Sequence, residues 1–129
     1  MTQMNIDRMD IIVNELMSGI KIADALKKVY KQRHIILPHD EELLKVGLEK
    51  LNMSNKTTNA LFRNRMQTLN DVVNYCNVHK ITNLKLFGRS AGIELFESIL
   101  NYMWDNMSNE ERKYLLIDIV ERNEDNAIL

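Results

Sequence analysis

Residues 53–96 read MSNKTTNALFRNRMQTLNDVVNYCNVHKITNLKLFGRSAGIELF, and this stretch decides the fold that we expect. Its first helix start is at Ser54, a residue type that favours such positions. A second helix start follows at Thr68-Leu69-Asn70-Asp71, where a hydroxyl and a carboxylate three residues apart can satisfy backbone N–H groups. A glycine turn, Phe87-Gly88-Arg89-Ser90, then leads into a further apolar run. The stretch therefore predicts short helices joined by tight turns.

The residues before this stretch carry apolar side chains at intervals of three and four, as amphipathic helices do. We expect one helix over 6–17, ended by Ser18-Gly19, and a second over 20–32. The first helix is expected to turn these residues toward the core: Ile6, Met9, Ile12 or Val13, and Leu16. In the second helix the expected core residues are Ile22, Ala25, Leu26, Val29 and Tyr30.

The remaining segments complete a helical pattern. Residues 34–38 and 46–53 are expected to be extended, with a short helix between them. The second of these segments is expected to pack Leu48, Leu51 and Met53 on the core. A helical turn is expected over 79–84. A long helix is expected over 90–104. Ser108-x-x-Glu111 opens a terminal helix that buries Leu115, Leu116, Ile119 and Val120. The acidic tail after Arg122 is expected to fray.

Composition favours one globular, all-α domain. The chain has 129 residues, 45% of them hydrophobic and 27% charged, with four glycines and one proline. It has no apolar run long enough for a transmembrane helix. The N-terminus lacks the pattern of a secretory signal, and the lone Cys76 fits a reducing compartment. We therefore expect a cytoplasmic protein.

Positive charge is concentrated in the middle of the chain. Residues 50–93 carry seven basic side chains and one acidic one, or +6, although the net charge of the whole chain is −1. Residues 94–129 carry three basic and nine acidic side chains, or −6. Such separation creates local fields that attract a polyanion. The alternative is chance clustering of solvated side chains.

The Phe87-Gly88-Arg89-Ser90 turn offers an anion site at a helix start, where backbone N–H groups lack helical partners. Gly88 would let the backbone approach the anion, Arg89 would add charge, and Ser90 would add a further donor. The alternative is an ordinary capped turn without a ligand. Catalytic and metal sites are not indicated, because the three histidines and Cys76 lack ligand spacing and no catalytic motif occurs.

Residues 51–100 resemble the C-terminal domain of the bacterial RNA polymerase alpha subunit. Three motifs in the family's order carry the resemblance: Met53-Ser54-Asn55-Lys56-Thr57-Thr58-Asn59-Ala60-Leu61, Thr68-Leu69-Asn70-Asp71-Val72, and Phe87-Gly88-Arg89-Ser90-Ala91 with Glu94-Leu95. The resemblance implies a helix-hairpin-helix-like module over 48–104, a compact bundle of short helices that contacts the DNA minor groove and phosphates and touches transcription factors. Residues 1–47 would form an N-terminal helical pair, and 105–129 a C-terminal helix with an acidic tail.

The resemblance also implies particular contacts. Lys56 occupies the position of the family's minor-groove arginine, Asn59 that of an asparagine on the same helix, and Gly88 and Arg89 that of the turn. Lysine at 56 lacks the planar donor fork of arginine. Ser90 and Ala91 stand where the family has lysine and serine, so weak sequence selectivity is expected.

We therefore expect a non-enzymatic DNA-contacting protein of transcription regulation, without cofactor or metal. The resemblance implies a free-standing regulator or mobile-element protein that borrows the module. The expected DNA-contacting residues are Lys56, Asn59, Arg63, Gly88, Arg89 and Ser90. The alternative is a protein-interaction module that engages RNA polymerase, a sigma factor or a host protein, which the acidic residues 94–129 favour. The N-terminal helical pair would either pack on the module or form a homodimer.

Overall fold

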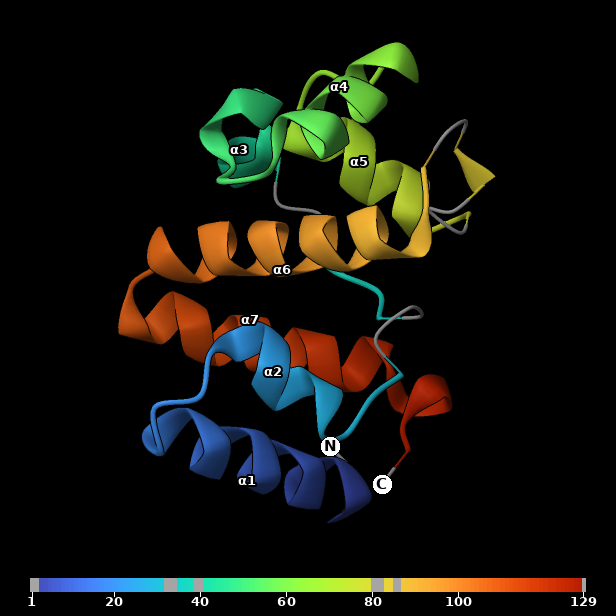
Figure 1. Ribbon diagram of the computed structural model, residues 1–129. Helices are drawn as coiled ribbons and strands as arrows, with labels where there is room; N and C mark the ends of the chain where they lie inside the picture. Colours follow the sequence, from blue (N-terminus) through green and yellow to red (C-terminus); the bar gives the residue numbers. More distant parts are fainter. Residues whose placement is uncertain (1–2, 32–34, 39–40, 80–82, 85–86, 129) are drawn as a thin grey trace. The chain divides into compact units, whose positions relative to one another are not determined.

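The computed structural model describes residues 3–31, 35–38, 41–79, 83–84 and 87–128 (Figure 1). Their regular structure is helical apart from two isolated backbone bridges, which confirms the all-α class for the described residues. The elements are α1 Gln3–Met17, α2 Ile22–Lys27, α3 Glu41–Leu44, the 3-10 turn η2 Leu48–Lys50, α4 Asn55–Arg63, α5 Leu69–Cys76, α6 Arg89–Asp105, α7 Asn109–Arg122 and the 3-10 turn η4 Glu124–Asn126.

The chain divides into two compact units. Unit 1 contains residues 1–38 and 104–129, and unit 2 contains residues 39–103. Unit 1 is thus assembled from both ends of the sequence, whereas unit 2 is continuous. None of the helices in the described ranges has the length and apolar character needed to cross a membrane.

In unit 1, α1 packs against α2 and α7, but its buried face differs from the expected one. The helix ends at Gly19 as expected, with φ +90° and an Ile20 N–H bond to Glu15 O of 3.1 Å. The buried residues are Asn5, Arg8 and Ile12, while Ile6 and Val13 are exposed and Met9 and Leu16 are half-buried. Burial of Asn5 and Arg8 is possible because Arg8 Nη1 donates to Asn5 Oδ1 at 3.0 Å.

The second helix ends at Lys27, so the expectation that it runs to residue 32 is wrong. After this helix the backbone bonds to the C-terminal tail instead: Tyr30 forms an antiparallel bridge with Ala127, and Ile128 N donates to Val29 O at 2.8 Å. The residues expected in the core are nevertheless all buried: Ile22, Ala25, Leu26, Val29 and Tyr30.

The segment after Arg122 does not fray as expected, because Asn123 holds it to the connector after α2. Asn123 is buried, and its side chain accepts from Ile36 N at 2.6 Å and donates to Ile36 O at 2.8 Å. Residues 124–126 then form η4. One amide side chain therefore satisfies both backbone groups of a residue 87 positions away in the sequence.

The last helix of unit 1 follows the sequence closely. Ser108 and Glu111 form the expected capping box at the start of α7, and the four apolar residues expected in the core are buried: Leu115, Leu116, Ile119 and Val120. Arg112 reaches back to the end of α6, where its Nε donates to Trp104 O at 2.8 Å and its guanidinium lies 4.9 Å from the ring centre.

In unit 2, α4 and α5 lie on one side of α6 (Figure 1). Both helix starts that the sequence predicts are present, with Ser54 capping α4 and a Thr68–Asp71 capping box opening α5. The expectation that residues 46–53 are extended is wrong, because residues 48–50 form the 3-10 turn η2. Before this turn, the backbone forms one isolated antiparallel bridge, between Gly47 and Thr68. Its apolar residues Leu48 and Leu51 are buried as expected.

The glycine turn does lead into a long helix, which begins at Arg89. Of the helical turn expected over 79–84, residues 80–82 lie outside the described ranges. The helix-hairpin-helix-like arrangement of residues 48–104 stays a prediction.

Candidate nucleic-acid interface

The outer surface of α4 carries three of the six expected DNA-contacting residues. The helix buries Thr57, Ala60 and Leu61. Lys56, Asn59 and Arg63 lie on the other side, at intervals of three and four residues, and all three are exposed. They therefore form one row along the helix, available to a ligand in solvent.

Arg65 extends this row beyond the end of α4. Its backbone has φ +63°, and it is exposed. Arg65 N donates to Phe62 O at 3.0 Å, and Met66 N donates to Leu61 O at 3.1 Å. This pair of hydrogen bonds is that of a Schellman helix ending. Glycine usually occupies this left-handed position, because any other residue costs about 1–2 kcal/mol there. Here an exposed cation occupies it.

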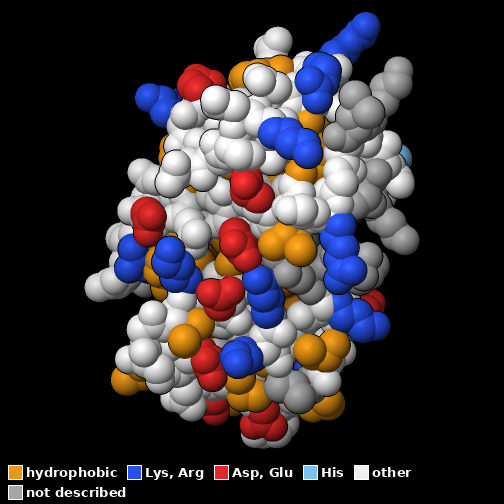
Figure 2. Space-filling view, in the orientation of Figure 1, with side chains coloured by type: hydrophobic (Ala, Val, Ile, Leu, Met, Phe, Trp, Pro, Cys, Tyr) orange, Lys and Arg blue, Asp and Glu red, His pale blue; other side chains and the backbone are white. Residues whose placement is uncertain are grey.

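We call Lys56, Asn59, Arg63 and Arg65 the α4 surface. Residues 50–70 contain four basic side chains and no acidic one. Figure 2 shows Lys and Arg side chains gathered over α4. Phe62, the residue before Arg63, has 44% of its area exposed on the same helix. The α4 surface therefore offers positive charge, an amide and an aromatic ring to an anionic partner.

The N-terminus of α4 is occupied by a carboxylate from the same chain. Glu94 Oε1 accepts from Ser54 N at 2.9 Å and from Ser54 Oγ at 3.0 Å. The bond from the Ser54 backbone N–H is the main cause that holds the pKa of Glu94 below its ordinary value. Glu94 thus takes the place that a phosphate would take at this helix start. It also limits the charge of the unit, since residues 39–103 contain eight basic and seven acidic residues.

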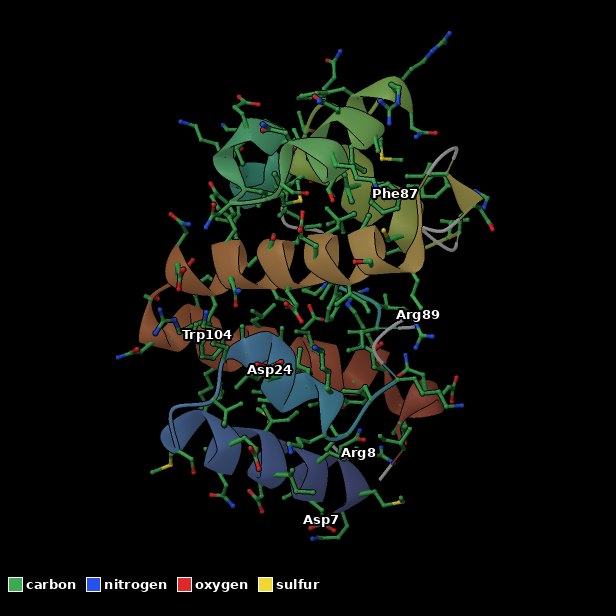
Figure 3. The ribbon with its side chains drawn as sticks, viewed as in Figure 1. Asp7, Arg8, Asp24, Phe87, Arg89 and Trp104 are labelled. Atoms are coloured by element: carbon green, nitrogen blue, oxygen red, sulfur yellow. The ribbon has the colours of Figure 1, made fainter. Side chains whose placement is uncertain are left out.

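The other three expected contact residues lie at the start of α6. Gly88, Arg89 and Ser90 are all exposed. The Arg89 side chain, however, leaves α6 on the side away from α4, while Phe87 lies buried on the α5 side (Figure 3). The structure therefore separates the six residues into two groups, and Arg89 does not join Lys56 and Arg63 on one face.

The glycine in this turn is not required by the backbone. Gly19 is the one described glycine with positive φ, so Gly88 adopts a conformation open to other residues. A side chain added at Gly88 would meet no atom within 4 Å. The exposed turn can accept an anion at its N–H groups, but the geometry gives Gly88 no particular role there.

Sequence reasoning missed two parts of the interface. Arg65 stands between two apolar residues, Leu61 and Met66, that have the spacing of a Schellman ending, so a local signal existed. The Glu94 contact with Ser54 spans 40 positions and has no local signal.

Cys76 is the one cysteine of the chain, and it lies within the described ranges. Burial raises the pKa of the Cys76 thiol to about 11, which keeps it protonated and unreactive at neutral pH. Within the described ranges, no group of three or more His, Cys, Asp or Glu side chains is placed to hold a metal ion.

No protein-family model, no curated protein and no solved structure matches this chain. The resemblance to the polymerase alpha C-terminal domain therefore stays an expectation from the sequence.

Proposed function

We propose that the protein contacts DNA without catalysing a reaction, and that it does so through the α4 surface. The observation that carries the proposal is Arg65, an exposed cation held in a backbone conformation that favours glycine. Strained residues are found where a contact outweighs their cost. Arg65 prolongs a row that already holds Lys56 and Arg63, so a shared anionic ligand explains all three.

The spacing of the row suits a nucleic-acid backbone. Arg63 follows Lys56 by seven residues, about 10 Å along a helix that rises 1.5 Å per residue. A rigid helix with cations along one side can follow successive phosphates, and Asn59 between them can donate to a phosphate or a base edge. Phosphate contacts carry little sequence information, so binding of low sequence selectivity is expected. A role in transcription regulation is part of this proposal and rests on the sequence resemblance.

Salt dependence tests the proposal quantitatively. Three phosphate contacts, from Lys56, Arg63 and Arg65, give a slope of log affinity against log salt of about −2.7 on duplex DNA. Fluorescence anisotropy with a labelled duplex at several salt concentrations measures this slope. Lys56→Ala and Arg63→Ala are each expected to reduce its magnitude by about 0.9.

Two matched variants assign the site. Lys113→Ala removes an exposed cation from α7, and Arg89→Ala removes the one that points away from α4. Both are expected to leave the slope unchanged. Absence of binding at low salt would overturn the proposal, as would equal losses in Lys56→Ala and Lys113→Ala. A loss confined to Arg89→Ala would transfer the site to the start of α6.

Protein interaction is the second candidate function, and Glu94 is the observation that favours it. A carboxylate already bonded at the start of α4 repels a phosphate approaching there. A protein partner such as RNA polymerase would instead use Phe62 and the surrounding polar side chains. Phe62→Ala would then abolish binding to purified polymerase, while added DNA would not compete.

A further inference from the structure

Phe62 is the exposed apolar residue of α4. The other apolar side chains of this helix are buried, with Ala60 at 2% and Leu61 at 0% exposure, whereas Phe62 exposes 44% of its area. A phenyl ring has no group that can hydrogen-bond to a phosphate, but its face stacks on another aromatic face. The ring therefore contributes to binding only where a ligand brings an apolar or aromatic surface to α4.

The helix places Phe62 and the cations on opposite sides of Asn59. At about 100° per residue, Phe62 lies about 60° from Asn59 around the axis in one direction. Arg63 and Lys56 lie about 40° and about 60° away in the other direction. All four residues are exposed. The outer side of α4 thus has a cationic edge, a central amide and an aromatic edge, with about 8 Å between the two edges on a helix about 10–12 Å wide.

The cations of the α4 surface are available to a ligand. Among the residues that the structure describes, no ion pair engages Lys56, Arg63 or Arg65. Residues 50–70 contain no acidic side chain that could neutralise them. Charge complementarity therefore calls for an anionic ligand, and the position of Phe62 calls for a ligand that carries an aromatic face about 8 Å from its negative charge.

We infer that the ligand of the α4 surface is unpaired DNA, with one base stacked on Phe62 and its phosphates held by the three cations. This inference rests on the proposed DNA contact and narrows its ligand. In a duplex the base faces are stacked on one another, and a protein meets only base edges and backbone. An unpaired base offers its whole face, and the sugar separates it from its phosphate, so one nucleotide can reach from the cationic edge to Phe62.

Stacking gives the α4 surface a preference that phosphate contacts cannot give. Stacking of one base on an aromatic side chain changes affinity by about 5- to 150-fold. With three cations the slope of log affinity against log salt is about −2.1 on a single strand and about −2.7 on duplex DNA. The preference for the single strand is therefore expected to grow by about twofold when the salt concentration is raised fourfold.

Fluorescence anisotropy of the full chain with three labelled probes of about 16 nucleotides tests the inference: a thymidine single strand, an abasic single strand and a duplex. Phe62→Leu keeps an apolar side chain but removes the ring. It is expected to weaken thymidine-strand binding at least about fivefold, without changing the salt slope, and to leave abasic-strand binding unchanged. Tyr114→Leu is the matched control, because Tyr114 is an aromatic residue with 62% exposure on α7. Circular dichroism checks folding, and Phe62→Met replaces Phe62→Leu if that variant is unfolded.

A second readout reports stacking directly. The indole of Phe62→Trp is expected to lose emission when the thymidine strand is added, because a stacked base quenches it, and to keep its emission with the abasic strand. The wild-type chain is the control, since its single tryptophan, Trp104, lies in unit 1. Its emission is expected to stay constant with both strands.

The outcomes separate this inference from the proposed function. Duplex binding that depends on Lys56 and Arg63 but is at least as tight as thymidine-strand binding would overturn the inference and leave the proposed function standing. Equal effects of Phe62→Leu on the thymidine and abasic strands, or equal effects of Phe62→Leu and Tyr114→Leu, would overturn the inference in the same way. Absence of binding to all three probes at low salt would overturn both.

Discussion

Arg65→Gly separates stability from binding, because the two properties are expected to move in opposite directions. Relief of the left-handed backbone at φ +63° is worth about 1–2 kcal/mol. The greater freedom of glycine in the unfolded chain offsets about 0.4–1 kcal/mol of this gain. We therefore expect Arg65→Gly to raise the free energy of unfolding by about 0.5–1 kcal/mol, or the melting temperature by about 2–4 °C.

The same substitution removes one of the three cations of the α4 surface. The slope of log affinity against log salt is expected to change from about −2.7 to about −1.8. Urea or thermal unfolding measures the first effect, and anisotropy with labelled duplex DNA measures the second. Arg65→Ala is the matched control, because it loses the same charge but keeps a side chain in the left-handed conformation.

Two outcomes would refute this reasoning at different points. If Arg65→Gly were no more stable than Arg65→Ala, the backbone of Arg65 would not be strained in the way its φ angle indicates. If Arg65→Gly were stabilised but bound DNA with the wild-type slope, the strain would be real and the proposed contact wrong.

Other predictions follow from single contacts. Glu94→Gln should tighten DNA binding in anisotropy titrations, because a negative charge beside the α4 surface is removed. Because folding lowers the pKa of Glu94 below its ordinary value of 4.5, this group stabilises the fold above that pH, and the contribution is lost as pH falls through the lowered pKa. Acid unfolding curves should therefore be shallower near pH 4.5 for Glu94→Gln. Asn123→Ala should cost about 2 kcal/mol in urea unfolding, since Ile36 loses both backbone partners, whereas the exposed Asn14→Ala should change little. Cys76 should react with a thiol reagent at pH 8 far more slowly in the folded protein than in urea, because its pKa is raised to about 11.

The helix starts could be predicted because their signals are local. Ser54 and the Thr68 and Ser108 boxes each place the capping group within three residues of the N–H that it satisfies. The orientation of α1 could not be predicted in this way. A helical pattern assigns apolar residues to the core, whereas Asn5 and Arg8 are buried and hydrogen-bonded to each other.

Long-range contacts explain the other differences. The backbone after α2 bonds to the C-terminal tail, through the bridge between Tyr30 and Ala127. The tail in turn is held by the hydrogen bonds between Asn123 and Ile36. In the interface, the row of Lys56, Asn59 and Arg63 follows from helical spacing. The direction of Arg89 and the placement of Glu94 at Ser54 depend on how α6 packs in unit 2, which no local pattern specifies.

The division of unit 1 between two distant segments has a consequence for synthesis on the ribosome. Residues 39–103 emerge as one continuous segment and can fold while translation is still under way. The buried side chains of α2, and the backbone of Val29, Tyr30 and Ile36, must wait for residues 104–128. A nascent chain that stalls before Asn123 therefore displays the apolar face of its first helices to solvent, and such exposed surfaces are prone to aggregation.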